Sequence, residues 1–281
     1  MFQGFIATYI YPLGWAAFMV ACVSVFELFK PGGRDAGVWG RLYNARMFIF
    51  IFILFSFLSP YLSLFTSLFP SGGIFYLLSI EWKKETILDY IAATIMYAAV
   101  WDFFQYWTHR VQHMVPFLWP FHRVHHSDEA FGASTALRQG AGGTFLGFLF
   151  THVPTLALCG TEMLPAMGAT ILFAGWGYFN HANIALSLGP ITPILSGPQW
   201  HRLHHGRARE YYDCNFAAFF PIYDIIFGTY RGPKSGEYPE TGVDDGPPYD
   251  SALKEAFAPA FPLIENISRR NAKAPLQTSE S

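Results

Sequence analysis

The chain has 281 residues, of which 52% are hydrophobic and only 14% are charged. Soluble domains carry about 25% charged residues, so this composition disfavours a soluble protein and favours one that spans a membrane. The net charge of −2 gives no sign of nucleic-acid binding, and three widely separated cysteines predict neither a disulfide framework nor a thiolate metal site.

The first membrane segments are predicted from apolar runs, because a spanning helix needs about 20 mostly apolar residues. Residues 5–29 meet this length and are interpreted as a first span rather than as a removed signal peptide. Residues 30–46 are polar, basic and rich in glycine, and they predict a loop. The uncharged run 47–80 is too long for one span. We expect a span over 47–69 followed by an interfacial piece, with a helical hairpin bent at Pro60 as the alternative.

Further apolar runs follow in the middle of the chain. Residues 88–107 predict a third span, interrupted by Asp102. Residues 143–159 and 163–180 predict a hairpin of two spans joined by a tight turn. Residues 184–197 are short and broken by prolines, so they are expected to be interfacial.

The end of the chain is polar. A linker begins near residue 232 and is rich in proline and glycine. Residues 251–264 predict a short amphipathic helix on the membrane surface, and 269–281 have the composition of a disordered tail.

These elements predict an all-α fold, an integral membrane helical bundle of about four or five spans with a cytosolic helical cap. The chain divides into 1–87 with the N-terminal spans, 88–232 with the histidine motifs, and 233–281 with the linker and tail. Cytoplasmic loops are enriched in Lys and Arg. Four such residues in 30–46, against two in 81–85, place the histidine motifs on the cytoplasmic face.

Eight of the ten histidines form one HxxxH motif and two HxxHH motifs, each just past a predicted span. A spacing of three or four residues puts side chains on one side of a helix, so each motif presents a compact fan of imidazoles. Eight imidazoles exceed what one tetrahedral zinc ion can use, and they suit two metal ions with open positions. The candidate ligands are His109, His113, His122, His125, His126, His201, His204 and His205.

Other polar residues could support these ligands. His181 ends the fifth predicted span at the same membrane face and is a ninth candidate ligand. Asp102 could accept a hydrogen bond from a ligand histidine, with Gln105 near the same face, or it could pair with an arginine, Arg110 or Arg138. Asp213 and Asn215 are candidates for the same supporting role, or for a turn or helix cap. His152 is expected to be a core histidine bonded to a neighbouring helix.

Five segments, "WDFFQYWTHRVQH", "FHRVHH", "FNHAN", "WHRLHH" and "YYDCNFAAFFPIYDIIFGTYRGP", together resemble the fatty acid hydroxylase superfamily, also called the sterol desaturase family. The resemblance covers residues 88–232. It implies a membrane-bound non-haem di-iron enzyme that uses O₂ and two electrons to hydroxylate a C–H bond of a lipid or sterol, or to desaturate it. The eight motif histidines and His181 would be its iron ligands.

The electrons are expected from a separate cytochrome b5-like or ferredoxin-like donor with its reductase, because the sequence shows no fused haem domain. "GAGGTFLG" (140–147) does not match a dinucleotide fingerprint. A zinc metallohydrolase is a remote alternative, since the histidine motifs contain no carboxylate as general base. A metal transporter or sensor is another, although its ligands would lie midway along the spans.

Overall fold

The computed structural model describes residues 11–78, 85–160 and 163–244. Regular structure in these ranges is helical throughout, with only two isolated β-bridges, so the predicted all-α class is confirmed. The predicted surface helix over 251–264 and the tail over 269–281 lie outside the described residues.

Helix α2 (Tyr11–Glu27) covers most of the first predicted span, and α3 (Gly37–Thr66) follows it. The prediction of a loop over 30–46 is wrong from Gly37 onward. The reason is that the polar side chains of this stretch have partners far away in the sequence: Asn44 Nδ2 donates to Asp128 Oδ2 at 2.9 Å and to Ser134 Oγ at 3.1 Å. The backbone therefore stays helical where composition alone indicated a break.

Pro60 lies inside α3, so the alternative of a hairpin bent at this residue is also wrong. The helix has 30 residues and is about 45 Å long, against about 30 Å for the hydrocarbon core of a membrane. Part of α3 must therefore project beyond such a core. The end near Asn44 is that part, because it packs against the polar cap.

Helix α4 (Gly73–Leu77) is short, and α5 (Ile87–Met114) is the long helix that carries the HxxxH motif. A capping box starts α5: Thr86 Oγ1 accepts from the Asp89 amide, while the Asp89 carboxylate accepts from the Thr86 amide at 2.8 Å. The predicted third span is extended by seven residues at its C-terminal end, which takes the motif into the cap.

The next rod consists of α7 (Ala141–Gly147), the π-helical turn η3 (Phe148–His152) and α8 (Val153–Cys159). It ends at Gly160, whose φ of +81° and close approach to the backbone of Ser71 leave no room for a side chain. Helix α9 (Met163–Asn180) follows and packs against α5. Both predicted spans of this region are thus helical.

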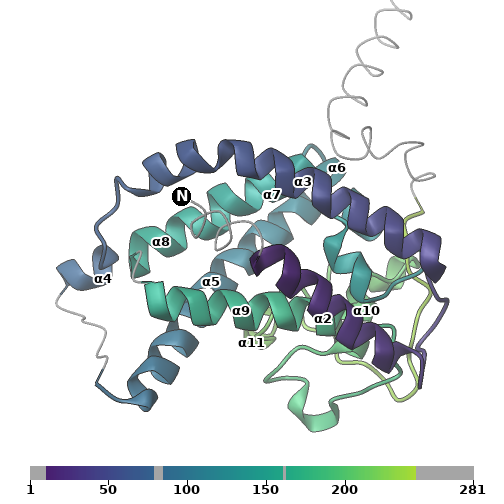
Figure 1. The fold of residues 1–281 in the computed structure, drawn as a ribbon. Helices are drawn as coiled ribbons and strands as arrows, with labels where there is room; N and C mark the ends of the chain where they lie inside the picture. The colour runs from purple at the N-terminus through teal and green to yellow at the C-terminus, as the bar shows by residue number, and fades with distance from the viewer. Residues whose placement is uncertain (1–10, 79–84, 161–162, 245–281) are drawn as a thin grey trace, which may run out of the picture.

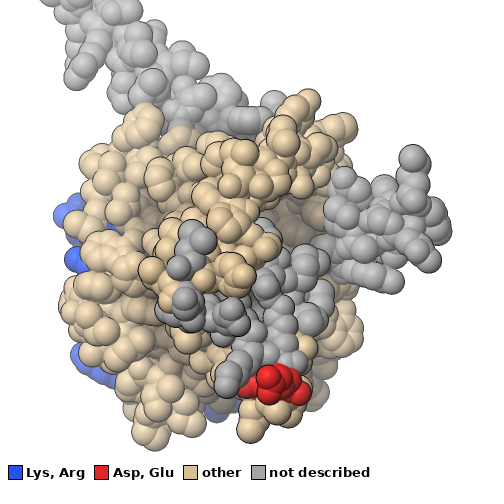
Figure 2. Space-filling view, turned by 90° about the vertical axis from the view of Figure 1, so that its left-hand side faces the viewer, with Lys and Arg blue, Asp and Glu red and all other residues tan. Residues whose placement is uncertain are grey.

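Within the described residues, three helical segments are long and apolar enough to cross a membrane: α3, α5 and the rod 141–159. The segment Leu13–Glu27 is a shorter apolar helix. Large apolar side chains such as Phe57 and Leu64 are 75% and 69% exposed, which a water-facing surface would not favour. Figure 2 shows the end of the bundle nearest α4, where the few charged residues drawn lie at the edges.

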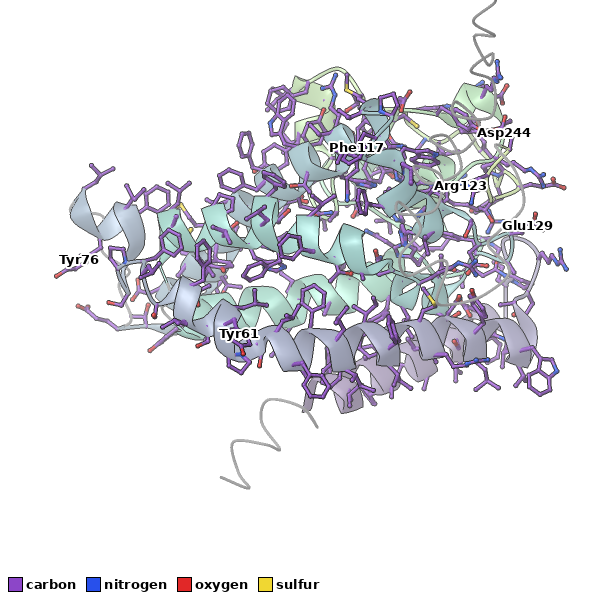
Figure 3. The ribbon with its side chains drawn as sticks, turned by 90° about the horizontal axis from the view of Figure 1, so that it is seen from above. Tyr61, Tyr76, Phe117, Arg123, Glu129 and Asp244 are labelled. Atoms are coloured by element: carbon purple, nitrogen blue, oxygen red, sulfur yellow. The ribbon has the colours of Figure 1, made fainter. Side chains whose placement is uncertain are left out.

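The cap gathers at the opposite end of the bundle (Figure 1). It contains α6 (Trp119–His126), the 3₁₀ turn η2 (Ala133–Leu137), α10 (Pro198–His204), the 3₁₀ turn η5 (Arg209–Tyr211) and α11 (Ile222–Ile226). Seen from above, Arg123, Glu129 and Asp244 lie at this end, and Tyr61 and Tyr76 lie at the other (Figure 3). Residues 184–197 contain only the 3₁₀ turn η4 (Gly189–Ile191), consistent with the expected short, non-spanning segment.

A buried carboxylate fastens α2 to the cap. Glu27 is 4% exposed, and its Oε1 accepts from the amides of Ala133 at 2.7 Å and Asn183 at 2.8 Å. Arg41 of α3 also reaches Glu27, at 3.3 Å, and pairs with the exposed Asp35 at 2.6 Å. One side chain thus joins the first two helices to two separate cap segments.

Replacement of Glu27 by alanine leaves two buried amides without their acceptor and removes one of the two carboxylate partners of Arg41. We expect Glu27→Ala to cost about 3–5 kcal/mol and to lower Tm by roughly 10 °C, measured by thermal unfolding in detergent. Asp35→Ala is the matched control, because it removes the exposed partner of the same arginine and should cost less than about 1 kcal/mol. Equal shifts for both variants would contradict this role of Glu27.

Candidate metal centre

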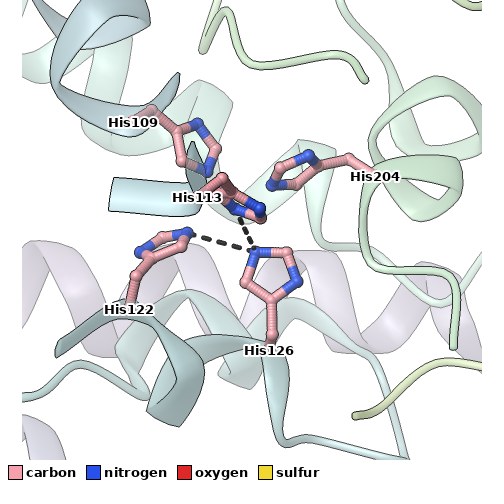
Figure 4. A group of neighbouring side chains, drawn as sticks. All are labelled: His109, His113, His122, His126 and His204. Carbon is pink, nitrogen blue, oxygen red and sulfur yellow. Dashed lines mark hydrogen bonds between the residues drawn. The ribbon is translucent and has the colours of Figure 1, made fainter. Parts of the chain in front are cut away.

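All nine histidines proposed from the sequence converge in the cap, where they divide into two groups. Within each group the nearest ring nitrogens lie within 4.8 Å of one another. Group 1 is drawn in Figure 4 and consists of His109, His113, His122, His126 and His204. Group 2 consists of His125, His181, His201 and His205.

Each HxxHH motif contributes to both groups. On α6, the outer pair His122 and His126 joins group 1, while His125 joins group 2. On α10 the division is reversed: the outer pair joins group 2, and His204 joins group 1. Residues four apart share a helix face and the third points elsewhere, so this exchange follows from the spacing itself. The rings of His126 and His205 stack at 4.2 Å where the groups meet.

Four of the rings are oriented by backbone carbonyls. Because a carbonyl only accepts hydrogen bonds, an Nδ1 whose partner is a carbonyl alone must carry the proton, which leaves the lone pair on Nε2. This holds for His109 with Phe216, His204 with Cys214 and His181 with Gly177, each at 2.7 Å. His125 Nδ1 lies 3.2 Å from the Arg138 carbonyl and 3.2 Å from the Gln139 side-chain nitrogen, a donor, so its tautomer is not fixed in this way.

The Nε2 atoms point inward and face one another. His181 Nε2 lies 3.0 Å from His125 Nε2 and 3.1 Å from His201 Nε2. Among the described residues, the Nε2 atoms of His109 and His204 and both ring nitrogens of His205 are buried without a partner. A cation at the centre of each group would satisfy these lone pairs, so the residues fit metal ions.

The electrostatic environment keeps the rings neutral. Burial, followed by the charges of neighbouring imidazoles, lowers the pKa of His122, His126 and His205 well below its usual range. Burial likewise lowers the pKa of His181 to about 4, although its bond to Gly177 opposes the shift. Neutral imidazole is the form that binds metals, so the rings hold this form at neutral pH without needing to lose protons.

The segment 213–216 acts as a backbone template for group 1. The carbonyls of Cys214 and Phe216 orient two histidines, as described above, and Asp213 Oδ1 lies 3.9 Å from His113 Nδ1. Asp213 and Asn215 have φ values of 56° and 61°, the left-handed region that Asp and Asn tolerate better than most residues. Along the chain, the left-handed residues 213 and 215 therefore alternate with 214 and 216, whose carbonyls orient the histidines.

The candidate Asn215 is completely buried and contacts backbone rather than histidine. Its side-chain amide donates to the carbonyls of Trp200 and Arg231, at 3.1 and 3.0 Å, and accepts from the Arg231 amide at 2.8 Å. Asn215 therefore supports group 1 through the template segment. Asp213 lies closer to a histidine of group 1, but the 3.9 Å between its Oδ1 and His113 Nδ1 exceeds a hydrogen-bond distance.

For Asp102, the structure replaces both predictions. The carboxylate bonds neither a ligand histidine nor Arg110 or Arg138. Instead it accepts from the amides of three consecutive residues, Ala218, Phe219 and Phe220, at 2.8, 3.1 and 2.6 Å. These partners lie about 117 residues away in sequence, so spacing on the helix could not identify them.

Asp224 is a positioning residue that the sequence reading missed. Its buried carboxylate accepts from the amides of Phe216 and Ala217 at 2.7 and 2.9 Å. Two buried carboxylates therefore hold the continuous stretch 216–220. The only sequence signal was an acidic residue in the apolar run "FPIYDIIF", which also suits an ordinary helix start.

Gln105 and His152 lie beside the site rather than in it. Gln105 accepts from Thr151 Oγ1 at 3.3 Å. Trp101 Nε1 donates to His152 Nδ1 at 3.4 Å, so His152 bonds to a neighbouring helix as predicted. Its side chain is exposed and lines the open space between these helices, however, so the prediction that it lies in the packed core is wrong.

Two cavities reach the histidines from different sides. The bundle cavity, of about 390 Å³, lies between α5, the rod α7–η3 and α9, and it contacts both groups through His109, His122, His125, His181 and His201. The cap cavity, of about 330 Å³, reaches group 1 through His113, His126 and His204, with Tyr212, Asp213 and Asp244 in its wall. The centre is thus accessible both from the apolar helices and from the polar cap.

The protein combines apolar helices long enough to span a membrane with two adjoining groups of buried histidines. These features together place it in the class of histidine-rich membrane proteins. The sequence model of the fatty acid hydroxylase family matches residues 94–229, which include all nine histidines. Residues 94–229 are therefore similar to the fatty acid hydroxylase family, as the resemblance predicted.

Among curated proteins, the chain is similar to an alkylglycerol monooxygenase of Homo sapiens, with 36% identity over 46% of this chain and 28% of that protein. It is 29% identical to a methylsterol monooxygenase of Aspergillus fumigatus, over 52% of this chain and 49% of that protein. An ornithine lipid hydroxylase of Rhizobium tropici is 27% identical over 50% and 43%. The match therefore spans between about a quarter and a half of these relatives. No solved structure matches the chain.

The lowered pKa values predict how the metal-free protein responds to acid. An unfolded histidine takes up a proton near pH 6.5, whereas His181 in the folded state does so only near pH 4. Between these values the unfolded chain binds more protons, so stability falls as the pH falls. We expect Tm of the metal-free protein to decrease steadily below pH 6.5. In His181→Gln the unfolded chain takes up about one proton fewer, so Tm should decrease less steeply with falling pH. A constant Tm of the wild-type protein between pH 7.5 and 5 would contradict the prediction.

Proposed function

We propose that the protein is a membrane-bound di-iron monooxygenase that hydroxylates an unactivated C–H bond of a lipid or sterol. The observation that carries this proposal is the inward convergence of neutral Nε2 lone pairs in two adjoining groups of five and four histidines. The reaction converts R–H, O₂, two electrons and two protons into R–OH and water.

The chain's own residues would hold and orient the metals. Group 1 would bind one iron and group 2 the other, with the carbonyls of Cys214, Phe216, Gly177 and Arg138 fixing four of the rings. When bound, the two irons supply the oxidising power that no set of side chains provides. Asp102, Asp224 and Asn215 act as positioning residues, because they hold the backbone that orients the histidines.

The partners follow from the position of the centre. The substrate would enter through the bundle cavity, whose walls belong to apolar helices, and electrons would come from a separate cytochrome b5-like or ferredoxin-like donor on the cap side. We place this cap on the cytoplasmic face. Arg41, together with Lys30, Arg34 and Arg46, lies at the start of α3 beside the cap, as expected for a cytoplasmic end.

A desaturase on the same site is the second candidate, because removal of two hydrogens uses the same oxidant. Hydroxylation is preferred because the three relatives described above are named as monooxygenases or a hydroxylase. A zinc hydrolase is disfavoured because, in the part of the chain that the structure describes, both groups consist of histidines alone. Neither group therefore contains a carboxylate that could act as its general base.

Metal analysis tests the proposal directly. We expect about two irons per chain in the purified protein. His204→Ala removes one Nε2 from group 1 and His125→Ala one from group 2, and each should lower the iron content to about one or less and abolish turnover while membrane insertion is retained. His152→Ala is the matched control for metal content, because this histidine belongs to neither group.

The reaction product is identified by lipid mass spectrometry of cells with and without the protein. A gain of one oxygen supports hydroxylation, and a loss of two hydrogens supports desaturation. Stoichiometric zinc, with no O₂ consumption under any reductant, would overturn the di-iron proposal.

A further inference from the structure

The bundle cavity differs from an ordinary apolar lipid tunnel in its walls. It is lined by segments of α5, the rod α7–η3 and α9, all of them predicted to lie within or next to the membrane. Yet many of its lining side chains are polar, and none of those that the structure describes is Lys, Arg, Asp or Glu. The polar lining residues include Gln105, Thr108, Gln112, Gln139, Thr144 and Asn180.

Three of the polar side chains form a stripe on one helix face. Gln105, Thr108 and Gln112 follow Trp101 at intervals of four, three and four residues, so all of them lie on the side of α5 that faces the cavity. Polar groups within an apolar helix are costly unless they find partners, and those that persist are commonly functional. Thr108 and Gln105 are partly satisfied by Thr151, at 3.0 and 3.3 Å.

Gln112 is not satisfied in this way. The residue is 5% exposed, and no hydrogen bond joins its amide to a residue that the structure describes. Its amide atoms are not fully enclosed, because the side chain lines the cavity and faces its open space. Gln112 lies three residues beyond His109, on the same cavity wall. Its donor and acceptor are therefore available to a ligand within about one helical turn, or about 5 Å, of group 1.

Two glycines keep the cavity open. A Cβ added to Gly147 of α7 or to Gly177 of α9 would meet no heavy atom within 4 Å, although both residues line the cavity. These positions therefore face empty space rather than a packed neighbour. Other glycines nearby behave differently: a Cβ on Gly142 would overlap the ring of Phe121. The open space at Gly147 and Gly177 is consistent with a ligand that occupies it.

We propose that the bundle cavity binds a lipid through an uncharged hydrogen-bonding group, such as an ether, amide, ester or hydroxyl, placed against Gln112. The carbon to be oxidised then lies within a few bonds of that group, not in the middle of an acyl chain. The absence of charged side chains from the described lining disfavours a free carboxylate or phosphate at this depth. This inference rests on the proposed function and specifies its substrate class.

Binding to the metal-free, full-length protein tests the inference without relying on turnover. The probes are four lipids with the same C16 chain: an alkyl ether alcohol, an N-alkyl amide, the free fatty acid and the n-alkane. We expect the ether and the amide to raise Tm in detergent more than the fatty acid or the alkane. Gln112→Leu should weaken ether and amide binding about 5- to 10-fold, the loss of one hydrogen bond, and leave the alkane unchanged.

A second pair of variants tests whether the cavity is the binding site. Gly147→Leu fills the open space and should abolish the lipid-dependent rise in Tm. Gly14→Leu is the matched control, because Gly14 also has no neighbour within 4 Å but lies on α2 away from the cavity. Equal binding by the two variants would overturn the assignment, and so would equal binding of all four probes by the wild-type protein.

Product analysis separates this inference from the proposed function. The iron-loaded protein could oxidise lipids near the middle of the acyl chain, with the oxidised carbon and the KM unchanged in Gln112→Leu. That result would show that the proposed substrate class is wrong, while the proposed monooxygenase activity would stand. If the polar lipids bind as expected but the protein holds no iron and consumes no O₂, the proposed reaction fails while the lipid site stands.

Discussion

The structure depends on the orientation of neutral imidazole rings by backbone carbonyls. A carbonyl fixes the proton on Nδ1 of His109, His204 and His181, so each Nε2 lone pair is directed into the centre. The Nε2 atoms of His109 and His204 have no partner among the described residues, which is unfavourable without a cation because burial removes the water that could satisfy them. The folding energy of the surrounding helices, together with any metal that binds, must therefore hold the rings in place.

Much of the structure outside the histidines serves this orientation. Asp102 and Asp224 hold the amides of 216–220, and Asn215, which is itself left-handed, bonds the backbone of Trp200 and Arg231. Glu27 performs a similar task for the cap segments near Ala133 and Asn183. In each case a buried polar side chain binds backbone amides or carbonyls. Loops without regular secondary structure thereby become rigid enough to position a metal ligand.

The sequence predicted what depends on local spacing. The all-α class follows from apolar runs, and the clustering of eight of the nine histidines follows from HxxxH and HxxHH, because residues three or four apart must share a side of a helix. It did not predict what depends on distant partners. The start of α3 at Gly37 is stabilised by contacts from Asn44 to residues over 80 positions away, and Asp102 finds its amides about 117 positions away. The role of Asp224 was missed for a different reason: its amide partners lie only seven and eight residues away, but in a segment without regular secondary structure, where spacing does not predict contacts.

The reciprocal division of the two HxxHH motifs has a consequence for how the centre would fill. Helices α6 and α10 each contribute to both groups, so neither group can adjust its geometry without moving a helix that serves the other. A first ion would align both helices, so binding of a second ion would involve a smaller loss of conformational entropy in α6 and α10. Loading of the two positions would therefore be positively cooperative, and partly filled centres would be rare at equilibrium.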